Sequence, residues 1–238
     1  EVDGDIILAT DPDCDRVGVM IKTSAGEYYK LTGNQTGALL AHYIISSLQK
    51  KGMLKENSFL VDTIVTGKMG QKIAEKYGVE TVSTLTGFKY IAQQIKNLED
   101  EGDKKFVFGY EESYGFLTGS FVRDKDGVIA SMLLCEMAAF YKEQGMTLYD
   151  ALMKLYEEYG YHKEEVFSIV MEGKEGALAI RSTMERMRNN PPETIAGLKV
   201  AEIRDYLVYE GPIKLPKENM LYFILEEGSW FAIRPSGT

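Results

Sequence analysis

The sequence predicts an α/β protein: a three-layer α/β/α domain followed by a smaller α+β domain with an antiparallel sheet. Between residues 33 and 160, short apolar runs alternate with stretches whose apolar residues recur at helical spacing. Repeated strand–helix units of this kind build three-layer domains. After residue 160 strand-like runs dominate, which favours an antiparallel sheet packed on helices. With 238 residues, 45% of them hydrophobic, the chain can bury the core of one large domain or of two ordinary ones.

The first 32 residues are expected to form strands and turns. Apolar runs at 5–10 and 17–21 flank an acidic loop, which is typical of two strands joined by a functional turn. Gly26 marks a second turn, and a short strand is expected after it at 28–31.

The region from 33 to 160 alternates helix and strand. Gly52 and Gly78 follow helical patterns and mark their ends, while Thr147 is a suitable N-cap and Gly160 a suitable stop. The helix at 128–141 is apolar on most faces, so we expect it to be buried. The expected helices are 38–50, 68–77, 88–98, 128–141 and 147–159, and the expected strands are 59–65, 79–82 and 105–108.

The best domain boundary lies at Gly160-Tyr161-His162, where the alternation stops. A helix is expected at 177–188, ended by Pro191-Pro192. The expected strands around it are 166–171, 198–203, 220–225 and 229–233.

The segment Asp11-Pro12-Asp13-Cys14-Asp15-Arg16 carries the strongest chemical signal. Three carboxylates alternate directly after an apolar strand, and they can point at one centre if the chain curves. Held together, they suit a hard divalent cation with oxygen ligands, and magnesium in such a place usually serves phosphate chemistry. Arg16 adds a planar fork that fits phosphate or carboxylate.

Other interpretations of this segment can be compared by spacing. An EF-hand loop would need glycine and glutamate where Arg16 and Lys22 stand. A haloacid-dehalogenase-type phosphatase usually has threonine or valine at position 15, and a glycosyltransferase Asp-x-Asp would leave Asp15 and Arg16 unexplained. An acidic turn in water, or carboxylates that cap a helix, is the simpler alternative on the motif alone.

Three more motifs follow the acidic loop along the chain. They are Thr86-Gly87-Phe88-Lys89, then Gly109-Tyr110-Glu111-Glu112-Ser113-Tyr114-Gly115, and finally Arg234-Pro235-Ser236-Gly237-Thr238. In this order and spacing, the four motifs resemble those of the α-D-phosphohexomutase family, the phosphoglucomutases and phosphomannomutases. The resemblance covers essentially the whole chain and looks closest to the bacterial phosphoglucomutases.

The resemblance implies a domain plan. Family members have four domains around one cleft, and the first carries a phosphoserine in a loop that this sequence lacks. By this likeness, residues 1–32 are the tail of domain two with its metal loop, residues 33–160 are the sugar-binding domain three, and residues 161–238 are an incomplete, phosphate-binding domain four. The chain is then expected to be a fragment, inactive alone, whose partner is the missing phosphoserine domain of the same polypeptide.

The resemblance also implies a reaction, an isomerisation in which a phosphoryl group moves between O6 and O1 of a hexose. It passes through a bisphosphate, so glucose 1,6-bisphosphate is the implied activator and Mg²⁺ the implied metal. Asp11, Asp13 and Asp15 would bind the metal, and Arg16 and Lys89 would assist catalysis.

The likeness assigns the remaining motifs to a phosphorylated sugar substrate. Glu111 and Ser113 would bind sugar hydroxyls, because a carboxylate accepts hydrogen bonds from two hydroxyls and a serine hydroxyl either donates or accepts one. The family often has glycine where Tyr110 stands here. The non-reacting phosphate would be held by Arg234, Ser236, Gly237 and Thr238. Without the resemblance, Lys89 reads as a solvated surface lysine and these loops as polar turns.

Composition narrows the alternatives. A net charge of −9 argues against nucleic-acid binding, which needs clustered lysine and arginine. No apolar run reaches transmembrane length and no signal peptide is evident, so we expect a cytoplasmic protein without a membrane partner. A phosphopentomutase of the same superfamily and a non-catalytic sugar-phosphate-binding module remain the rival functions.

Overall fold

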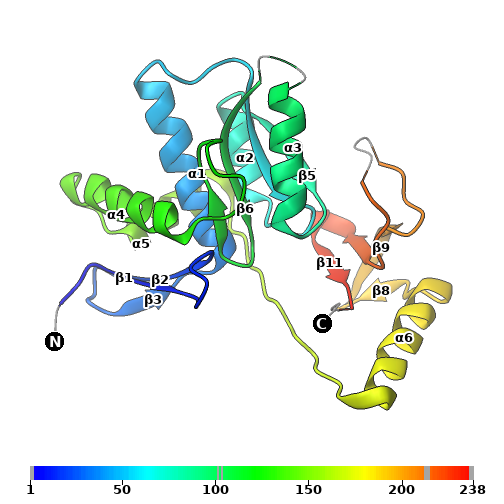
Figure 1. The fold of residues 1–238 in the computed structure, drawn as a ribbon. Coiled ribbons are helices and arrows are strands. Elements are labelled where there is room, and N and C mark those ends of the chain that lie inside the picture. The colour runs from blue at the N-terminus through cyan, green and yellow to red at the C-terminus, as the bar shows by residue number, and fades with distance from the viewer. Residues whose placement is uncertain (1–2, 101, 103, 212–214, 236–238) are drawn as a thin grey trace. The chain divides into compact units, whose positions relative to one another are not determined.

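The computed structural model describes residues 3–100, 102, 104–211 and 215–235. The chain divides into two compact units, residues 1–164 and 165–238 (Figure 1). The first unit therefore holds both the N-terminal strands and the α/β region. The finer boundaries expected after residues 32 and 160 stay predictions.

The first unit begins with a small antiparallel sheet. Its strands β1 (Ile6–Thr10), β2 (Val17–Lys22) and β3 (Tyr28–Lys30) lie in chain order. Thr10 pairs with Val17, so the acidic loop at 11–16 is the connection of a hairpin. These strands lie close to where the sequence predicts them.

A second sheet forms the middle layer of the α/β region. Strands β4 (Ser58–Thr63), β5 (Glu80–Thr84), β6 (Lys105–Glu111) and β7 (Gly115–Leu117) lie in the order β5-β4-β6-β7. β4 is parallel to β5 and β6, whereas β7 returns antiparallel to β6. The sequence analysis did not anticipate β7, which has only three residues.

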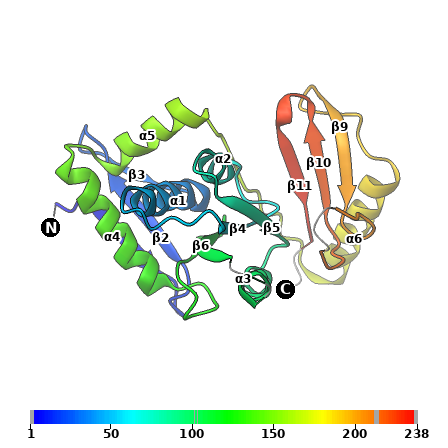
Figure 2. The same ribbon diagram turned by 90° about the horizontal axis from the view of Figure 1, so that it is seen from above.

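Helices on both faces of this sheet confirm the predicted three-layer architecture. Figure 2 shows α1 (Gly33–Lys50) and α2 (Met69–Lys76) on one face and α3 (Phe88–Asp100) on the other. α4 (Gly127–Glu143) and α5 (Leu148–Tyr159) contact α1 and the first sheet. The N-cap predicted at Thr147 is confirmed and forms a capping box with Asp150, and an equivalent box at Thr32 starts α1 five residues before the expected helix.

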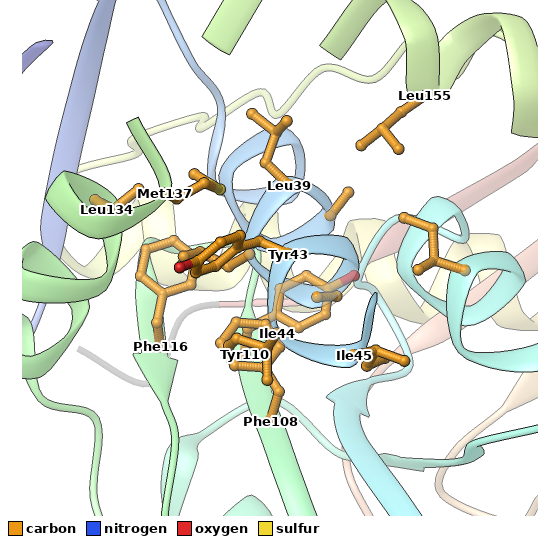
Figure 3. Packing of buried hydrophobic residues seen from close by; sticks show 14 of the residues in the cluster. Leu39, Tyr43, Ile44, Ile45, Phe108, Tyr110, Phe116, Leu134, Met137 and Leu155 are labelled. Carbon is orange, nitrogen blue, oxygen red and sulfur yellow. The ribbon is translucent and has the colours of Figure 1, made fainter. Parts of the chain in front are cut away.

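The core of the first unit lies between α1, β6, β7, α4 and α5 (Figure 3). Buried apolar side chains from all five elements meet there, and they include Leu39, Tyr43, Ile44, Ile45, Phe108, Tyr110, Phe116, Leu134, Met137 and Leu155. This core fixes the ends of β6 and β7, which carry the loop at 111–115.

Two expectations about apolar segments are wrong. α4 buries only one face, and Val128 and Met132 on the other are 67% and 60% exposed, because no described element covers that face. Residues 166–171 form no strand, and their apolar side chains are exposed. A β-branched run predicts a strand, but a strand also needs a hydrogen-bonded neighbour, and none in the described chain pairs with this run.

The second unit confirms the predicted α+β architecture. Strands β8 (Thr194–Ile195), β9 (Leu198–Asp205), β10 (Leu221–Leu225) and β11 (Trp230–Ile233) form an antiparallel sheet in the order β11-β10-β9-β8. A short 3₁₀ helix, η1 (Glu226–Gly228), joins the last two strands. α6 (Gly173–Asn189) packs Met184 on Leu221 and Phe223. No helix in the described parts of the chain is long and apolar enough to cross a membrane.

The Tyr110 side chain inserts as a wedge between α1 and α2. This packing gives a role to the tyrosine, which stands at a position where the resembling family often has glycine. Its ring is fully buried. A Cβ on Gly37 would lie 2.2 Å from Cδ2 of the ring, and a Cβ on Gly70 would lie 2.2 Å from the hydroxyl oxygen. The two helices can approach Tyr110 this closely because they carry glycine at both contact points.

Alanine at either glycine should destabilise the first unit by about 1–3 kcal/mol, the range for overpacking a close-packed core. The Tyr110 hydroxyl has no hydrogen-bond partner in the described structure, so Tyr110→Phe alone should be nearly neutral. Urea unfolding of the chain measures these changes. Tyr110→Phe should restore most of the stability lost in Gly70→Ala but not that lost in Gly37→Ala. Equal rescue of both variants, or of neither, would show that the wedge is misassigned.

Candidate functional site

The hairpin loop between β1 and β2 brings the three predicted metal ligands together. Asp11, Asp13 and Asp15 each offer a carboxylate oxygen, and these oxygens lie within 4.8 Å of one another. Ligand oxygens of a magnesium ion lie roughly 3–4 Å apart, so small side-chain rotations suffice to close the set. Oδ1 of Asp15 is buried and accepts no hydrogen bond in the described structure. The donor set therefore fits a hard divalent cation.

Arg16 lies against this cluster. Its Nε donates to Oδ2 of Asp11 at 2.6 Å and stands 3.6 Å from Oδ1 of Asp15, while its backbone N–H donates to Oδ1 of Asp11. Burial alone would raise the pKa of Asp11, but the hydrogen bonds from Arg16 outweigh it, and the pKa is lowered. Arg16 thus favours the ionised form of Asp11, the state that a metal ligand requires.

A lysine that the sequence analysis missed also faces the cluster. Lys125 Nζ lies 2.8 Å from Oδ2 of Asp15, and its side chain is only 20% exposed. Burial would lower the pKa of Lys125, but the hydrogen bond to Asp15 reverses this and raises it. Lys125 stands just before Asp126, the N-cap of α4. No motif marks it, and only its position before this N-cap could have drawn attention.

The acidic loop at 11–16, which we call the metal loop, is hydrogen-bonded to the start of α4. The Gly127 N–H donates to the Cys14 carbonyl at 3.0 Å, and a Cβ on Gly127 would lie 2.6 Å from that oxygen. Cys14 itself has a positive φ of 58°, which a residue other than glycine adopts only when its surroundings hold it. The loop shape is therefore set by contacts with α4 as well as by the hairpin.

The loop at 111–115, which we call the sugar loop, joins β6 to β7 beside the metal loop. The Val17 N–H donates to the Tyr114 carbonyl at 3.2 Å, and Arg16 forms an isolated β-bridge with Gly115. Ser113 is half-buried on this loop. A Cβ on Gly115 would lie 2.7 Å from Lys125, so the same lysine packs on both loops.

Glu111 connects the sugar loop to the motif at 86–89. It is 5% exposed, and its Oε1 accepts the Gly87 N–H at 2.7 Å. Burial raises the pKa of Glu111, which the Gly87 N–H only partly offsets. Lys89, at the start of α3, is exposed and lies 4.8 Å from the ring centre of Tyr90. Three of the four motifs are therefore neighbours in the first unit.

The fourth motif belongs to the second unit. Arg234 follows β11, and its Nη1 donates to Oε1 of Glu218 at 3.1 Å. Ser236, Gly237 and Thr238 lie outside the described residues. The phosphate-binding role of all four stays a prediction.

A buried carboxylate lies beneath the site at the end of β4. Asp62 accepts hydrogen bonds from Ser83 Oγ at 2.6 Å and Gln71 Nε2 at 2.8 Å. The next residue, Thr63, donates to Oε2 of Glu112 in the sugar loop. Burial raises the pKa of Asp62 from 3.8 to about 6. Sequence patterns did not identify Asp62, since a single acidic residue in an apolar strand has no motif.

The raised pKa of Asp62 predicts how stability depends on pH. The folded chain keeps this proton between pH 4 and 6, whereas the unfolded chain loses it, so stability falls as pH rises through that window. The loss is about 3 kcal/mol and persists above pH 6. Asp62→Asn should remove this contribution, because the amide keeps the oxygen that accepts from Ser83 and Gln71 can turn its own amide. Urea unfolding from pH 4 to 7 tests this, and parallel profiles for the two proteins would contradict it.

Known proteins resemble this chain over most of its length. Residues 32–159 match the family model described as phosphoglucomutase/phosphomannomutase, alpha/beta/alpha domain III. A phosphoglucomutase of Staphylococcus haemolyticus is 36% identical over an alignment of 247 positions, gaps included, which covers 100% of this chain and 44% of that protein. A phosphoglucomutase of Staphylococcus aureus strain MRSA252 is 40% identical over 98% of this chain and 43% of its own length. The chain thus spans less than half the length of these curated relatives.

Two solved structures share the fold. A putative phosphomannomutase from Thermus thermophilus superposes with a TM-score of 0.61 at 21% identity, over 97% of this chain and 40% of that one. The Paramecium phosphoprotein pp63/parafusin, a phosphoglucomutase in its open form, gives 0.63 at 22% identity, over 98% and 38%. Since the family's α/β/α domain matches more than half of the residues, the chain belongs to the phosphoglucomutase/phosphomannomutase family.

Proposed function

We propose that this chain is part of a phosphoglucomutase-like phosphohexomutase, an isomerase of carbohydrate metabolism that interconverts hexose 1-phosphate and hexose 6-phosphate. The observation that carries the proposal is the junction of three motifs in one unit. Lys125 binds the metal loop and packs on the sugar loop, and Gly87 binds Glu111. Phosphoryl transfer depends on positioning and charge neutralisation, which such a junction provides.

Each residue has a proposed role in this reaction. A magnesium ion held by Asp11, Asp13 and Asp15 would neutralise charge on phosphoryl oxygens. Arg16 and Lys125 supply fixed positive charge beside the carboxylates, where a phosphate arrives with negative charge. Lys89, near the N-terminus of α3, offers a further cation to the substrate.

The sugar is proposed to bind at Glu111 and Ser113. Oε1 of the Glu111 carboxylate accepts the Gly87 N–H, which leaves Oε2 to accept hydrogen bonds from sugar hydroxyls. Arg234, with Ser236, Gly237 and Thr238, is proposed to hold the non-reacting phosphate. The phosphoserine would come from another domain of the same polypeptide, and glucose 1,6-bisphosphate would recharge it. A cytoplasmic location accords with this substrate class and is part of the proposal.

The chain alone is expected to lack mutase activity. No serine in it has the family's phosphoserine context, and the metal loop supplies only electrostatic assistance. The chain mixed with Mg²⁺, glucose 1,6-bisphosphate and glucose 1-phosphate should form no glucose 6-phosphate above background, as measured by a coupled dehydrogenase. Robust, magnesium-dependent conversion by the 238-residue chain would mean that the phosphoryl carrier has been misassigned.

A further inference from the structure

Glu164 is a half-buried carboxylate that the proposed reaction does not use. It lies shortly after α5, and both of its oxygens accept hydrogen bonds from the start of α1. Oε1 accepts from Thr32 Oγ1 at 2.5 Å, and Oε2 accepts from Asn34 Nδ2 at 2.5 Å. These contacts join residues 130 or more positions apart in the sequence.

The partners of Glu164 extend its influence to the loop after β4. Asn34 uses its other side-chain atom, Oδ1, to accept the Gly67 N–H at 2.9 Å. A Cβ on Gly67 would lie 2.8 Å from Oε2 of Glu164, so the loop packs directly on the carboxylate. Asn34 is therefore a bridge whose orientation is set by Glu164.

The same two segments support the sugar loop. A Cβ on Gly33 would lie 2.0 Å from the Glu112 carbonyl oxygen, so the backbone at 112–114 rests on the first residue of α1. Thr63, the last residue of β4 and the start of the connection that leads to Gly67, donates to the Glu112 side chain at 3.1 Å. Anything that fixes α1 and Gly67 together thus also fixes the base of the sugar loop.

The charge of Glu164 suits this role. The structure records no ion pair to its carboxylate among the residues it describes, and the neighbouring charge that acts on it is the negative Glu112. Its compensation comes from two side-chain donors and from the N-terminal end of an 18-residue helix. Such a carboxylate is held in place by direction-specific hydrogen bonds rather than by a mobile surface salt bridge.

We propose that Glu164 is a positioning residue for the sugar loop, acting through Asn34 and Gly67. It holds the loop after β4 and the base of the sugar loop against the start of α1. The role assigned to the sugar loop in substrate binding rests on the proposed function. The hydrogen-bond linkage itself does not.

The linkage is tested in the chain by amide hydrogen exchange at Gly67 and at residues 112–114. In Glu164→Leu, the acceptor for the Asn34 amide is lost, so exchange at both places should accelerate about tenfold, as for loss of one charge-assisted hydrogen bond. Glu164→Gln should keep exchange close to that of the wild-type chain, because its amide oxygen can accept from Asn34 while its NH₂ donates to the neighbouring threonine hydroxyl. Glu165→Leu, at the exposed neighbouring position, is the matched control and should change nothing.

Unchanged exchange in Glu164→Leu, or exchange as fast in Glu164→Gln as in Glu164→Leu, would overturn the linkage. In the complete polypeptide, Glu164→Leu should raise the KM for glucose 1-phosphate about tenfold with kcat unchanged, because a loosened sugar loop loses uniform binding. A lowered kcat with unchanged KM would overturn the positioning role. If the complete wild-type protein shows no mutase activity, the proposed function fails, while hydrogen exchange still decides whether Glu164 positions the loop.

Discussion

Asp13→Asn is expected to abolish divalent-cation binding by this chain and, in the complete polypeptide, to lower activity by at least about 100-fold. A metal contributes several kcal/mol of charge stabilisation to phosphoryl transfer, and 3 kcal/mol corresponds to roughly this factor. The substitution replaces a charged ligand by a neutral amide in a set of only three carboxylates. Calorimetric titration with Mg²⁺ or Mn²⁺ measures the binding.

The chain should bind these ions weakly, since the family resemblance places a further ligand, the phosphoserine, on another domain. Asp100→Asn, at an exposed position at the end of α3, is the control and should leave binding unchanged. Equal affinity in Asp13→Asn and in the wild-type chain would remove the metal from Asp11, Asp13 and Asp15 and leave an acidic turn.

Glu111→Gln is expected to cost the complete polypeptide about 2–4 kcal/mol in kcat/KM, because a charged hydrogen-bond partner of the sugar is lost. The melting temperature should barely move. Glutamine keeps an oxygen for the Gly87 N–H, and replacing a buried carboxylate whose pKa is raised removes a desolvation penalty. Kinetics and thermal unfolding of the same preparation separate the two effects.

Glu75→Gln is the control for this experiment, because Glu75 is exposed on α2. A large fall in melting temperature with normal turnover in Glu111→Gln would assign the loop to folding instead of substrate recognition.

Local signals in the sequence predicted much of the fold. Capping residues and the glycine after a helix act within one turn, so α5 was placed correctly from Thr147 to Gly160. The alternating carboxylates likewise sit in a short loop whose curvature follows from pairing of the flanking strands. Features that depend on partners far away in the sequence were harder to predict. The run at 166–171 has the composition of a strand without a partner, and α4 has an apolar face that no described element covers.

The candidate site likewise has residues that a local motif predicts and residues that only long-range contacts reveal. Asp11, Asp13 and Asp15 come from one short motif, and the structure places their oxygens together. Neither Lys125 nor Asp62 belongs to a sequence motif. Lys125 contacts Asp15, and Asp62 contacts Ser83, so each contact joins segments more than 20 positions apart in the sequence. A lone lysine is usually exposed, and a lone aspartate in a strand has no period, so only the fold reveals their environments.

The most direct test of the account is a substrate comparison with the complete polypeptide that contains this chain. With Mg²⁺ and glucose 1,6-bisphosphate, it should convert glucose 1-phosphate to glucose 6-phosphate, and it should do so much faster than it converts ribose 1-phosphate to ribose 5-phosphate. Conversion of only the pentose phosphate would identify a phosphopentomutase. Binding of either sugar phosphate without turnover would identify a binding module and contradict the proposed reaction.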